Sequence, residues 1–571
     1  MTGAVHLDRR QIVTGAAASA AIAAAALPGT AIAQRKARRV IDVHCHVFNG
    51  KDIPAKRFLE IVVLQHYPDL SVGRRALEPV NLILQGVIRF IVARVTGAAP
   101  SVEAEIDCLR RGEDTCSMLA SRSGRAQTPS AIDEDVLADY ARLLEGKPRV
   151  TYFKEDKWLE DREALDAFIS ELRAAQGPAR VQEGKDLSDR AAQQELARRL
   201  NTSDYAFRKV KEWGDLLSGF RRDIVGKYLA TFDTGAHDIV LFAPALVDFS
   251  NWLGDTAASP LQQQVDLMDV LARRQRKARM HGYVAFDPLR QLLAEETRTM
   301  QTPLTLARAA VETQGFLGVK IYSPMGFRPT NNAGAGTTFP ATVMGGRRDF
   351  GARLDKALDD LYAWCRRDGV AILAHASNSQ AANREFGLRA DPKFWRIVLR
   401  KHRELRLNLA HFGRFEITGP GGAIDLNRLA GTWEWEIGRI IKQDRAPNVY
   451  ADLSYFTWII GNDTDARQRK LAAEALKRWF AEFDPECRRI LFGTDWAMTA
   501  PVRDSEGYLP RMIAFLQDVG LTEGQLDNVL FSNAVRFFGL RQGDRARSRL
   551  ASYYAMHKLN AAHLERFDGA S

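Results

Sequence analysis

The second half of the chain alternates short apolar segments with amphipathic segments of helical period, and this alternation strongly restricts the possible folds. From about residue 239 onward, the pattern is that of successive strand–helix units, which form parallel sheets. A further apolar segment near the amino terminus brings the expected number of strands to eight. They are Val40 to His44, Ile239 to Leu246, His281 to Phe286, Phe316 to Tyr322, Val370 to His375, Leu405 to His411, Asn448 to Leu453 and Arg489 to Asp495.

The spacing of these strands predicts an α/β fold, specifically a (β/α)8 TIM barrel. The last four strands end at residues 375, 411, 453 and 495, so the steps between them are 36, 42 and 42 residues. An eightfold barrel uses roughly 30 residues per unit, and loop insertions account for the rest. A chain of 571 residues exceeds what one core usually fills, so large insertions are expected.

The largest insertion separates the first strand from the second. Residues 51–235 read mostly as helix, notably at 155–175, 187–200 and 204–230, and predict an all-helical insertion. Because it leaves from the carboxyl end of strand 1, where barrel active sites lie, we expect a cap over the pocket. The alternative is a surface for a homodimer. The expected domains are strand 1 at 34–50, this insertion, barrel strands 2–8 at 236–540, and a helical tail at 541–571.

The first residues have the pattern of an export signal. Arg9 and Arg10 precede a bland run from Ile12 to Pro28, and Ala31-Ile32-Ala33 offers a small-residue cleavage site. This segment resembles a twin-arginine signal peptide at residues 1–33, which implies the Tat translocase as a partner and a periplasmic location. The alternative is a membrane anchor. The run is short and weakly hydrophobic, so no stable membrane span is expected after cleavage.

Composition excludes several classes of protein. Apolar content of 46% and charged content of 26% are those of an ordinary globular protein. The net charge of +10 is compatible with an anionic substrate, but no basic run with interleaved aromatic residues predicts nucleic-acid binding. Five cysteines are too few and too scattered for a disulfide scaffold. Cys108 and Cys116 are close enough in sequence to close a loop by a disulfide in an oxidising compartment.

Histidine and aspartate residues gather at the expected strand ends. His44 and His46 are two residues apart in a strand, so their imidazoles leave the same face. His375, His411 and Asp495 end strands five, six and eight, at the same mouth of the barrel. Any one of these residues taken alone would more often be structural. Neutral imidazole and carboxylate groups are ligands of divalent metals, so the combination favours a metal site.

The motifs resemble those of the amidohydrolase superfamily, and within it the amidohydrolase-related (amidohydrolase 2 type) family of metal-dependent hydrolases and decarboxylases. The matching segments are Asp42-Val43-His44-Cys45-His46, Gly315 to Lys320, Ala374-His375, Ala410 to Gly413, Gly493 to Trp496 and Ser532 to Arg536. The resemblance implies that His44, His46, His375 and Asp495 bind one divalent metal ion together with a water, with zinc as the expected metal. His411 would be a general base or an electrophilic stabiliser, and Asp495 would also accept the proton of the water.

Lys320 leaves the number of metal ions open. In some members of the superfamily a carboxylated lysine at this position bridges two metals, and His375 and His411 would then hold the second ion. The family that the chain resembles is usually mononuclear, so we expect one ion and an uncarboxylated Lys320. Arg328, Arg414 and Arg503 lie on loops that could bring them to a substrate carboxylate. Trp496 and Tyr455 follow strand ends and could stack on an aromatic substrate or pack against loops.

The resemblance implies a metal-dependent hydrolase that uses an activated water on a small organic substrate, in which a carboxylate group is one option. The first alternative is a metal-dependent nonoxidative decarboxylase on the same site, because the ligands fit both reactions. The second is a noncatalytic periplasmic binding protein that keeps the fold. Substrate identity depends on loop and cap contacts that a fold-level resemblance does not transfer.

Overall fold

The computed structural model describes residues 37–58, 62, 99–112, 216–334, 336–378, 381–383, 385–415, 424–460, 465–500, 502 and 504–569. The expected signal peptide at 1–33 and most of the expected insertion at 51–235 lie outside these residues. Cys116 and Arg503 lie outside them as well.

The strands of the described residues form two parallel sheets, with orders β1-β2-β3 and β4-β5-β6-β7-β8-β9. Every pair of neighbouring strands is parallel and follows the order of the sequence, which confirms the α/β class. The strands are β1 (Arg38–Cys45), β2 (His237–Pro244), β3 (Arg279–Met280), β4 (Tyr283–Ala285), β5 (Gly318–Ile321), β6 (Ala371–His375), β7 (Arg406–Ala410), β8 (Val449–Asp452) and β9 (Ile490–Leu491).

Backbone contacts join the two sheets at both seams. At one seam Ala245 bridges Tyr283 in parallel orientation, and the Leu246 N–H donates to the Tyr283 carbonyl at 3.0 Å. At the other, the Val43 N–H donates to the Phe492 carbonyl at 3.0 Å. The strands thus follow one another around a ring, as in the expected TIM barrel.

The segment expected as one strand from His281 to Phe286 differs in detail. The structure places only β4 within this segment; β3 precedes it, with His281 and Gly282 between the two strands. A Cβ at Gly282 would lie 2.0 Å from the carbonyl oxygen of Pro244, so only glycine allows this close approach of two backbones. The interruption is therefore the reason that the ring divides into two sheets here.

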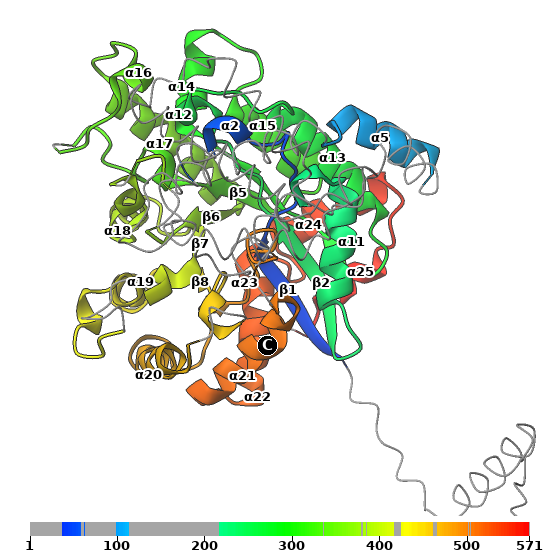
Figure 1. The fold of residues 1–571 in the computed structure, drawn as a ribbon, viewed down its shortest axis with the longest axis vertical. Helices are drawn as coiled ribbons and strands as arrows, with labels where there is room; N and C mark the ends of the chain where they lie inside the picture. Colours follow the sequence, from blue (N-terminus) through cyan, green and yellow to red (C-terminus); the bar gives the residue numbers. More distant parts are fainter. Residues whose placement is uncertain are drawn as a thin grey trace, which may run out of the picture.

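Helices surround the strands in Figure 1. Amphipathic sequence explains their placement: in α17, Leu354, Leu358 and Leu361 are buried at helical spacing against the core. The helices are α2 (Ala55–Arg57), α5 (Val102–Arg111), α11 (Arg221–Phe232), α12 (Ser250–Leu253), α13 (Leu261–Arg274), α14 (Pro288–Glu296), α15 (Pro303–Thr313), α16 (Ala341–Met344), α17 (Phe350–Asp368), α18 (Lys393–Lys401), α19 (Trp433–Lys442), α20 (Ala466–Phe483), α21 (Tyr508–Val519), α22 (Glu523–Asp527), α23 (Asn533–Phe538), α24 (Arg545–Met556) and α25 (Ala562–Glu565).

The described parts of the expected insertion are helical and meet beside the first strand. Arg221 at the start of α11 is fully buried and donates two hydrogen bonds to the carboxylate of Asp52, at 2.5 and 2.8 Å. It also donates to Glu105 of α5 at 3.1 Å. We call these three residues the Arg221 cluster. The cluster fastens both ends of the insertion to each other at the carboxyl end of β1.

Two smaller findings complete the fold. Cys108 in α5 is disulfide-bonded, and its expected partner Cys116 lies outside the described residues, whereas Cys45, Cys365 and Cys487 are free and buried. Among the helices that the structure describes, none combines the length and apolar character needed to cross a membrane.

Candidate metal centre

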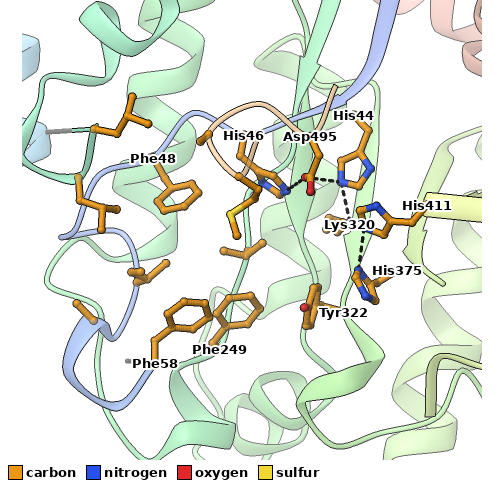
Figure 2. Close-up of a pocket in the computed structure, with 17 residues that line it drawn as sticks. His44, His46, Phe48, Phe58, Phe249, Lys320, Tyr322, His375, His411 and Asp495 are labelled. Carbon is orange, nitrogen blue, oxygen red and sulfur yellow. Dashed lines mark hydrogen bonds and ion pairs between the residues drawn. The ribbon is translucent and has the colours of Figure 1, made fainter. Parts of the chain in front are cut away.

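A pocket opens at the carboxyl ends of the strands. Figure 2 shows His44, His46, Lys320, His375, His411 and Asp495 turned toward one another at one end of it. These residues come from β1, β5, β6 and the segments after β1, β7 and β9. The expected site residues therefore share one pocket, except for the loop arginines described below.

His44, His46 and Asp495 form the most compact group. The Nε2 atom of His46 lies 3.2 Å from Asp495 Oδ1, and Nε2 of His44 lies 3.6 Å from the same oxygen. One donor atom of each of the three residues lies within 4.8 Å of the other two, close enough to hold one metal ion. All three residues are buried. The dashed lines in Figure 2 mark these two contacts.

The hydrogen bonds around His46 test whether a cation fits this group. Nδ1 of His46 donates to the carbonyl oxygen of Ala245 at 2.7 Å, because a carbonyl can only accept. When Nδ1 carries the single proton of the ring, the lone pair of His46 Nε2 faces Asp495 Oδ1, a buried oxygen with no hydrogen-bond donor within the described part of the chain. Two facing lone pairs repel unless a cation lies between them. The donor set therefore fits a divalent metal.

Asp452 and Ser454 hold the other side of His44, and sequence reasoning missed both. Nδ1 of His44 lies 3.3 Å from Asp452 Oδ2 and 3.0 Å from Ser454 Oγ. Asp452 also accepts from the backbone N–H of His411 at 3.0 Å. The contact fixes the proton of His44 on Nδ1 and leaves a lone pair on Nε2, the form that binds a metal. The available signal was an acid ending the expected strand from Asn448 to Leu453.

His44, His411 and Asp452 form a second compact group of possible ligands. In this group, however, hydrogen bonds satisfy the donors: Ser454 Oγ lies 2.9 Å from His411 Nδ1 and donates to Asp452. No pair of facing lone pairs results. We therefore place the metal between His44, His46 and Asp495 rather than here.

His375 and His411 contact each other instead of joining the compact group. His375 Nδ1 lies 3.2 Å from His411 Nε2, and His375 Nε2 lies 3.0 Å from Ser377 Oγ. Hydrogen bonds thus link Ser377, His375, His411 and Ser454, in that order, along the pocket. His375, expected as a ligand, lines the pocket but is absent from both groups of possible ligands among the described residues.

The protonation states suit metal binding. Burial lowers the pKa of His44 and His375, and lowers that of His411 to about 3, so these imidazoles are neutral at physiological pH. Burial alone would raise the pKa of Asp495, but its close contacts with His46, His44 and His411 outweigh it and lower that pKa. The site combines neutral imidazoles with an ionised carboxylate.

Lys320 lies beside the compact group, with its Nζ atom 3.2 Å from Nε2 of His44. Burial lowers the pKa of Lys320 to about 8. Of the pocket-lining residues that the structure describes, it is the only one with an ammonium or guanidinium group.

Asp42 ties the two strand ends that carry the group. Its carboxyl accepts from the Thr494 hydroxyl at 2.6 Å, from the Tyr228 hydroxyl at 2.9 Å and from the His44 N–H at 3.1 Å. Burial raises the pKa of Asp42 to about 7. Because Thr494 precedes Asp495, these bonds fix the distance between His44 and Asp495.

The backbone at two strand ends is unusual. His411 and Asp495 have positive φ angles of 67° and 52°. Left-handed backbone in residues other than glycine costs of order 1 kcal/mol and is concentrated at functional sites. Both residues turn their side chains into the pocket by this conformation (Figure 2).

The rest of the pocket is apolar. Phe58 and Phe249 stack with ring centroids 5.5 Å apart, and Tyr322 contacts Phe249 on one side and His375 on the other. Phe58 comes from the start of the expected insertion, and Leu216 and Leu217 come from its end. The remaining apolar lining residues are Phe48, Ile53, Ala55, Val247, Ala497 and Met498.

The other expected contacts lie away from the pocket lining. Arg328 lies over the ring of Phe394 at 4.9 Å, and Arg414 lies over Tyr455 at 4.7 Å. Neither arginine belongs to the described lining of the pocket. Trp496 is buried and packs against Phe232 with centroids 5.5 Å apart, which is a core contact.

The ring of parallel strands and the buried histidine–aspartate group define a metal-dependent α/β enzyme. The chain belongs to the amidohydrolase family, whose model matches residues 243–540, more than half of the chain. The match includes His375, His411 and Asp495, while His44 and His46 precede it. No curated protein matches the chain.

Several solved structures share low similarity. An amidohydrolase from Burkholderia multivorans with bound zinc is 14% identical, with 57% of this chain and 91% of that chain covered and a TM-score of 0.35. The 5-carboxyvanillate decarboxylase from Novosphingobium aromaticivorans with bound manganese is 15% identical, with coverages of 60% and 88% and a TM-score of 0.32. A putative 2-pyrone-4,6-dicarboxylic acid hydrolase from Pseudomonas putida is 15% identical, with coverages of 55% and 87% and a TM-score of 0.30.

Proposed function

We propose that this protein is a metal-dependent hydrolase that holds one divalent ion, zinc first, between His44, His46 and Asp495 on a (β/α)8 barrel. The observation that carries the proposal is the contact between His46 Nε2 and the donor-free, buried Asp495 Oδ1 at 3.2 Å. Three protein ligands leave positions open, as catalytic rather than structural sites do.

Each residue around the ion would have a separate role in the reaction. A divalent ion supplies Lewis acidity that polarises a carbonyl group and lowers the pKa of water from 15.7 to about 7. Asp495, ionised and adjacent, accepts the proton from the attacking water. The proton that Asp495 accepts would pass to the leaving group, and His411, neutral and hydrogen-bonded to His375, would stabilise the charge that develops beside it. Asp452 holds the orientation of His44 throughout.

The pocket walls support a substrate with an apolar body. Phe58, Phe249 and Tyr322 offer aromatic faces that fit a planar ring or an acyl chain. Arg328 and Arg414 do not line the pocket, so we propose an uncharged ester, lactone or amide rather than a dicarboxylate. The ends of the insertion supply part of this wall, which supports its role as a cap.

Lys320 favours a second candidate, a nonoxidative decarboxylase. Its buried ammonium beside His44 could pair with a substrate carboxylate before that group leaves as CO2. A panel of aryl esters, lactones and carboxylated aromatics, assayed for hydrolysis and for CO2, separates the two reactions. Hydrolysis without CO2 supports the proposal, and CO2 release without net water uptake replaces it with the decarboxylase.

The metal content tests the site itself. We expect about one ion per chain in the wild type and in Lys320→Met, and loss of the ion in Asp495→Asn. Asp504→Asn is the matched control, because Asp504 is exposed and has a similar left-handed φ of 58° that asparagine tolerates. Elemental analysis after zinc reconstitution gives the count.

Two outcomes would contradict the proposal. A second ion that disappears in Lys320→Met would indicate a lysine-bridged pair of metals. Wild-type protein that takes up no ion, or Asp495→Asn that keeps it, would remove the metal site and with it the hydrolase.

A further inference from the structure

A second hollow lies at the opposite end of the strands from the metal centre. Arg406 begins β7, Asn448 precedes β8, and Arg489 precedes β9, so the hollow opens at the amino ends of these strands. The metal-centre residues His411, Asp452 and Asp495 lie at or after the carboxyl ends of the same three strands. The two sites are therefore separated by the length of the sheet.

Five arginines from four segments of the chain line this hollow, which we call the arginine hollow. They come from the starts of β7 and β9, from α23 and from the loop before α24. The full lining is Arg406, Pro447, Asn448, Tyr450, Arg488, Arg489, Arg536, Arg541 and Asp544. Five guanidinium groups face one lining carboxylate, so the hollow carries a strong net positive charge.

Neutral oxygen atoms, not carboxylates, hold several of these arginines in place. Arg406 donates to the backbone carbonyl of Arg536 at 2.5 Å, and Arg489 donates to the carbonyl of Pro447. Arg536 donates to the side-chain oxygen of Asn533. Carbonyl oxygens orient the guanidinium group of Arg406 without neutralising its charge, so this positive charge is available to a ligand.

Arg488 and Arg541 complete the hollow as exposed groups. Their guanidinium groups form no ion pair or hydrogen bond with the residues that the structure describes. The buried carboxylate of Asp484 accepts the backbone N–H groups of Arg488 and Arg489, at 2.9 and 2.8 Å, and also interacts electrostatically with Arg489 and Arg536. Burial, together with the charges of Arg541, Arg488 and Arg489, lowers the pKa of Arg536. Mutual repulsion of this kind is relieved when an anion binds.

We propose that the arginine hollow binds a small phosphorylated ligand with at least two negative charges. Guanidinium groups bind phosphate oxygens in pairs, and several of them around a concave surface favour a multivalent phosphate over a single chloride or acetate. The ring of Tyr450, beneath Arg489 at 5.5 Å, gives the floor an aromatic face. The site is independent of the reaction at the metal centre.

Inorganic pyrophosphate is the probe for this proposal, measured by isothermal titration calorimetry at constant ionic strength on the full chain. We expect one pyrophosphate per chain, and about a tenfold or greater loss of affinity in the double variant Arg488→Gln/Arg541→Gln. Both residues are exposed, so the variant should fold. The matched control Arg428→Gln/Arg467→Gln removes the same charge from exposed positions outside the lining and should bind as the parent does.

Each other outcome overturns the proposal. Unchanged affinity in Arg488→Gln/Arg541→Gln would place the anion elsewhere, and an equal loss in the control would indicate nonspecific attraction to a basic surface. Citrate binding more tightly than pyrophosphate would exclude a phosphate ligand. No binding of either anion to the parent would remove the site. Metal content and hydrolysis should be unaffected in all four outcomes.

Discussion

At the scale of single residues, the candidate site depends on where each imidazole carries its proton. Ala245 fixes the proton of His46 on Nδ1, and Asp452 does the same for His44. Both Nε2 atoms then face Asp495. A sequence contains the histidines and the aspartate but not this choice of nitrogen, because a backbone carbonyl and a carboxylate from distant segments make it.

The substitution Asp452→Asn tests whether Asp452 holds the proton of His44 on Nδ1. The amide leaves the shape of the side chain but weakens the charge that holds His44, so we expect zinc affinity to fall about 10- to 100-fold. Competition with a chelator measures it. Asp484→Asn is the control, since Asp484 is also a buried acid but contacts backbone N–H groups at the other end of the strands. Equal losses in both variants would assign the effect to general destabilisation.

At the scale of elements, the strands were predictable and their side-chain partners were not. All eight expected strands are present within a few residues, because apolar runs between amphipathic helices specify parallel strands strongly. The common strand end of His44, His375, His411 and Asp495 followed from that order. The contact between His375 and His411 did not, because it depends on the left-handed backbone at His411, which no sequence motif encodes.

The same limit applies to the insertion. Its helical character in α5 and α11 could be predicted from composition, but the Arg221 cluster joins residues more than one hundred positions apart. Likewise, Leu216 and Phe58 are more than one hundred positions apart and line the same pocket. Long-range pairing of this kind has no local signal in the chain.

Arg221→Met should destabilise the protein strongly. The change leaves Asp52 and Glu105 as unpaired buried acids, at a cost of about 3–5 kcal/mol. Ile53 and Phe58 line the pocket near Asp52, so KM should also rise. Chemical unfolding and limited proteolysis measure the first effect, with Arg222→Met as the neighbouring control, since Arg222 pairs with the exposed Asp223. Equal unfolding midpoints for the two variants would contradict the role of the cluster.

At the scale of the whole molecule, the C-terminal segment is part of the core. Tyr554 of α24 and Leu564 of α25 are buried in a hydrophobic cluster with residues of β1, β2 and β6. His281, between β3 and β4, contacts the Tyr554 hydroxyl of this segment through Nε2 at 2.9 Å, while its Nδ1 donates to the Gly315 carbonyl of the barrel at 2.8 Å. From the sequence, residues 541–571 were expected to be a helical tail, and no role could be predicted for them.

Because His281 is buried in this contact with Tyr554, we expect the free energy of unfolding to fall in acid. Burial lowers the pKa of His281 from 6.5 to about 3, so between these values the folded protein holds fewer protons than the unfolded chain. The contribution of neutral His281 to the stability of the fold is complete above pH 6.5 and is lost as the pH falls toward 3. The loss is about 1.4 kcal/mol per pH unit, which amounts to a few kcal/mol over this range. Unfolding of chelator-treated protein across this range measures the change.

His281→Gln removes the titrating group, so its stability should depend less on pH than that of the parent. Tyr554→Phe keeps the histidine and should retain the steeper dependence. Parallel curves for the parent and His281→Gln would show that other groups cause the acid effect.

The Arg221 cluster also has a consequence for how the protein could be remodelled. Since direct contacts hold Asp52, Glu105 and Arg221 to one another, the placement of Phe58 and Leu216 in the pocket lining does not depend on the length of the chain segment that joins residue 112 to residue 216. That segment can therefore be replaced, in evolution or by protein engineering, to change which molecules enter the pocket while the ion-binding side chains keep their positions.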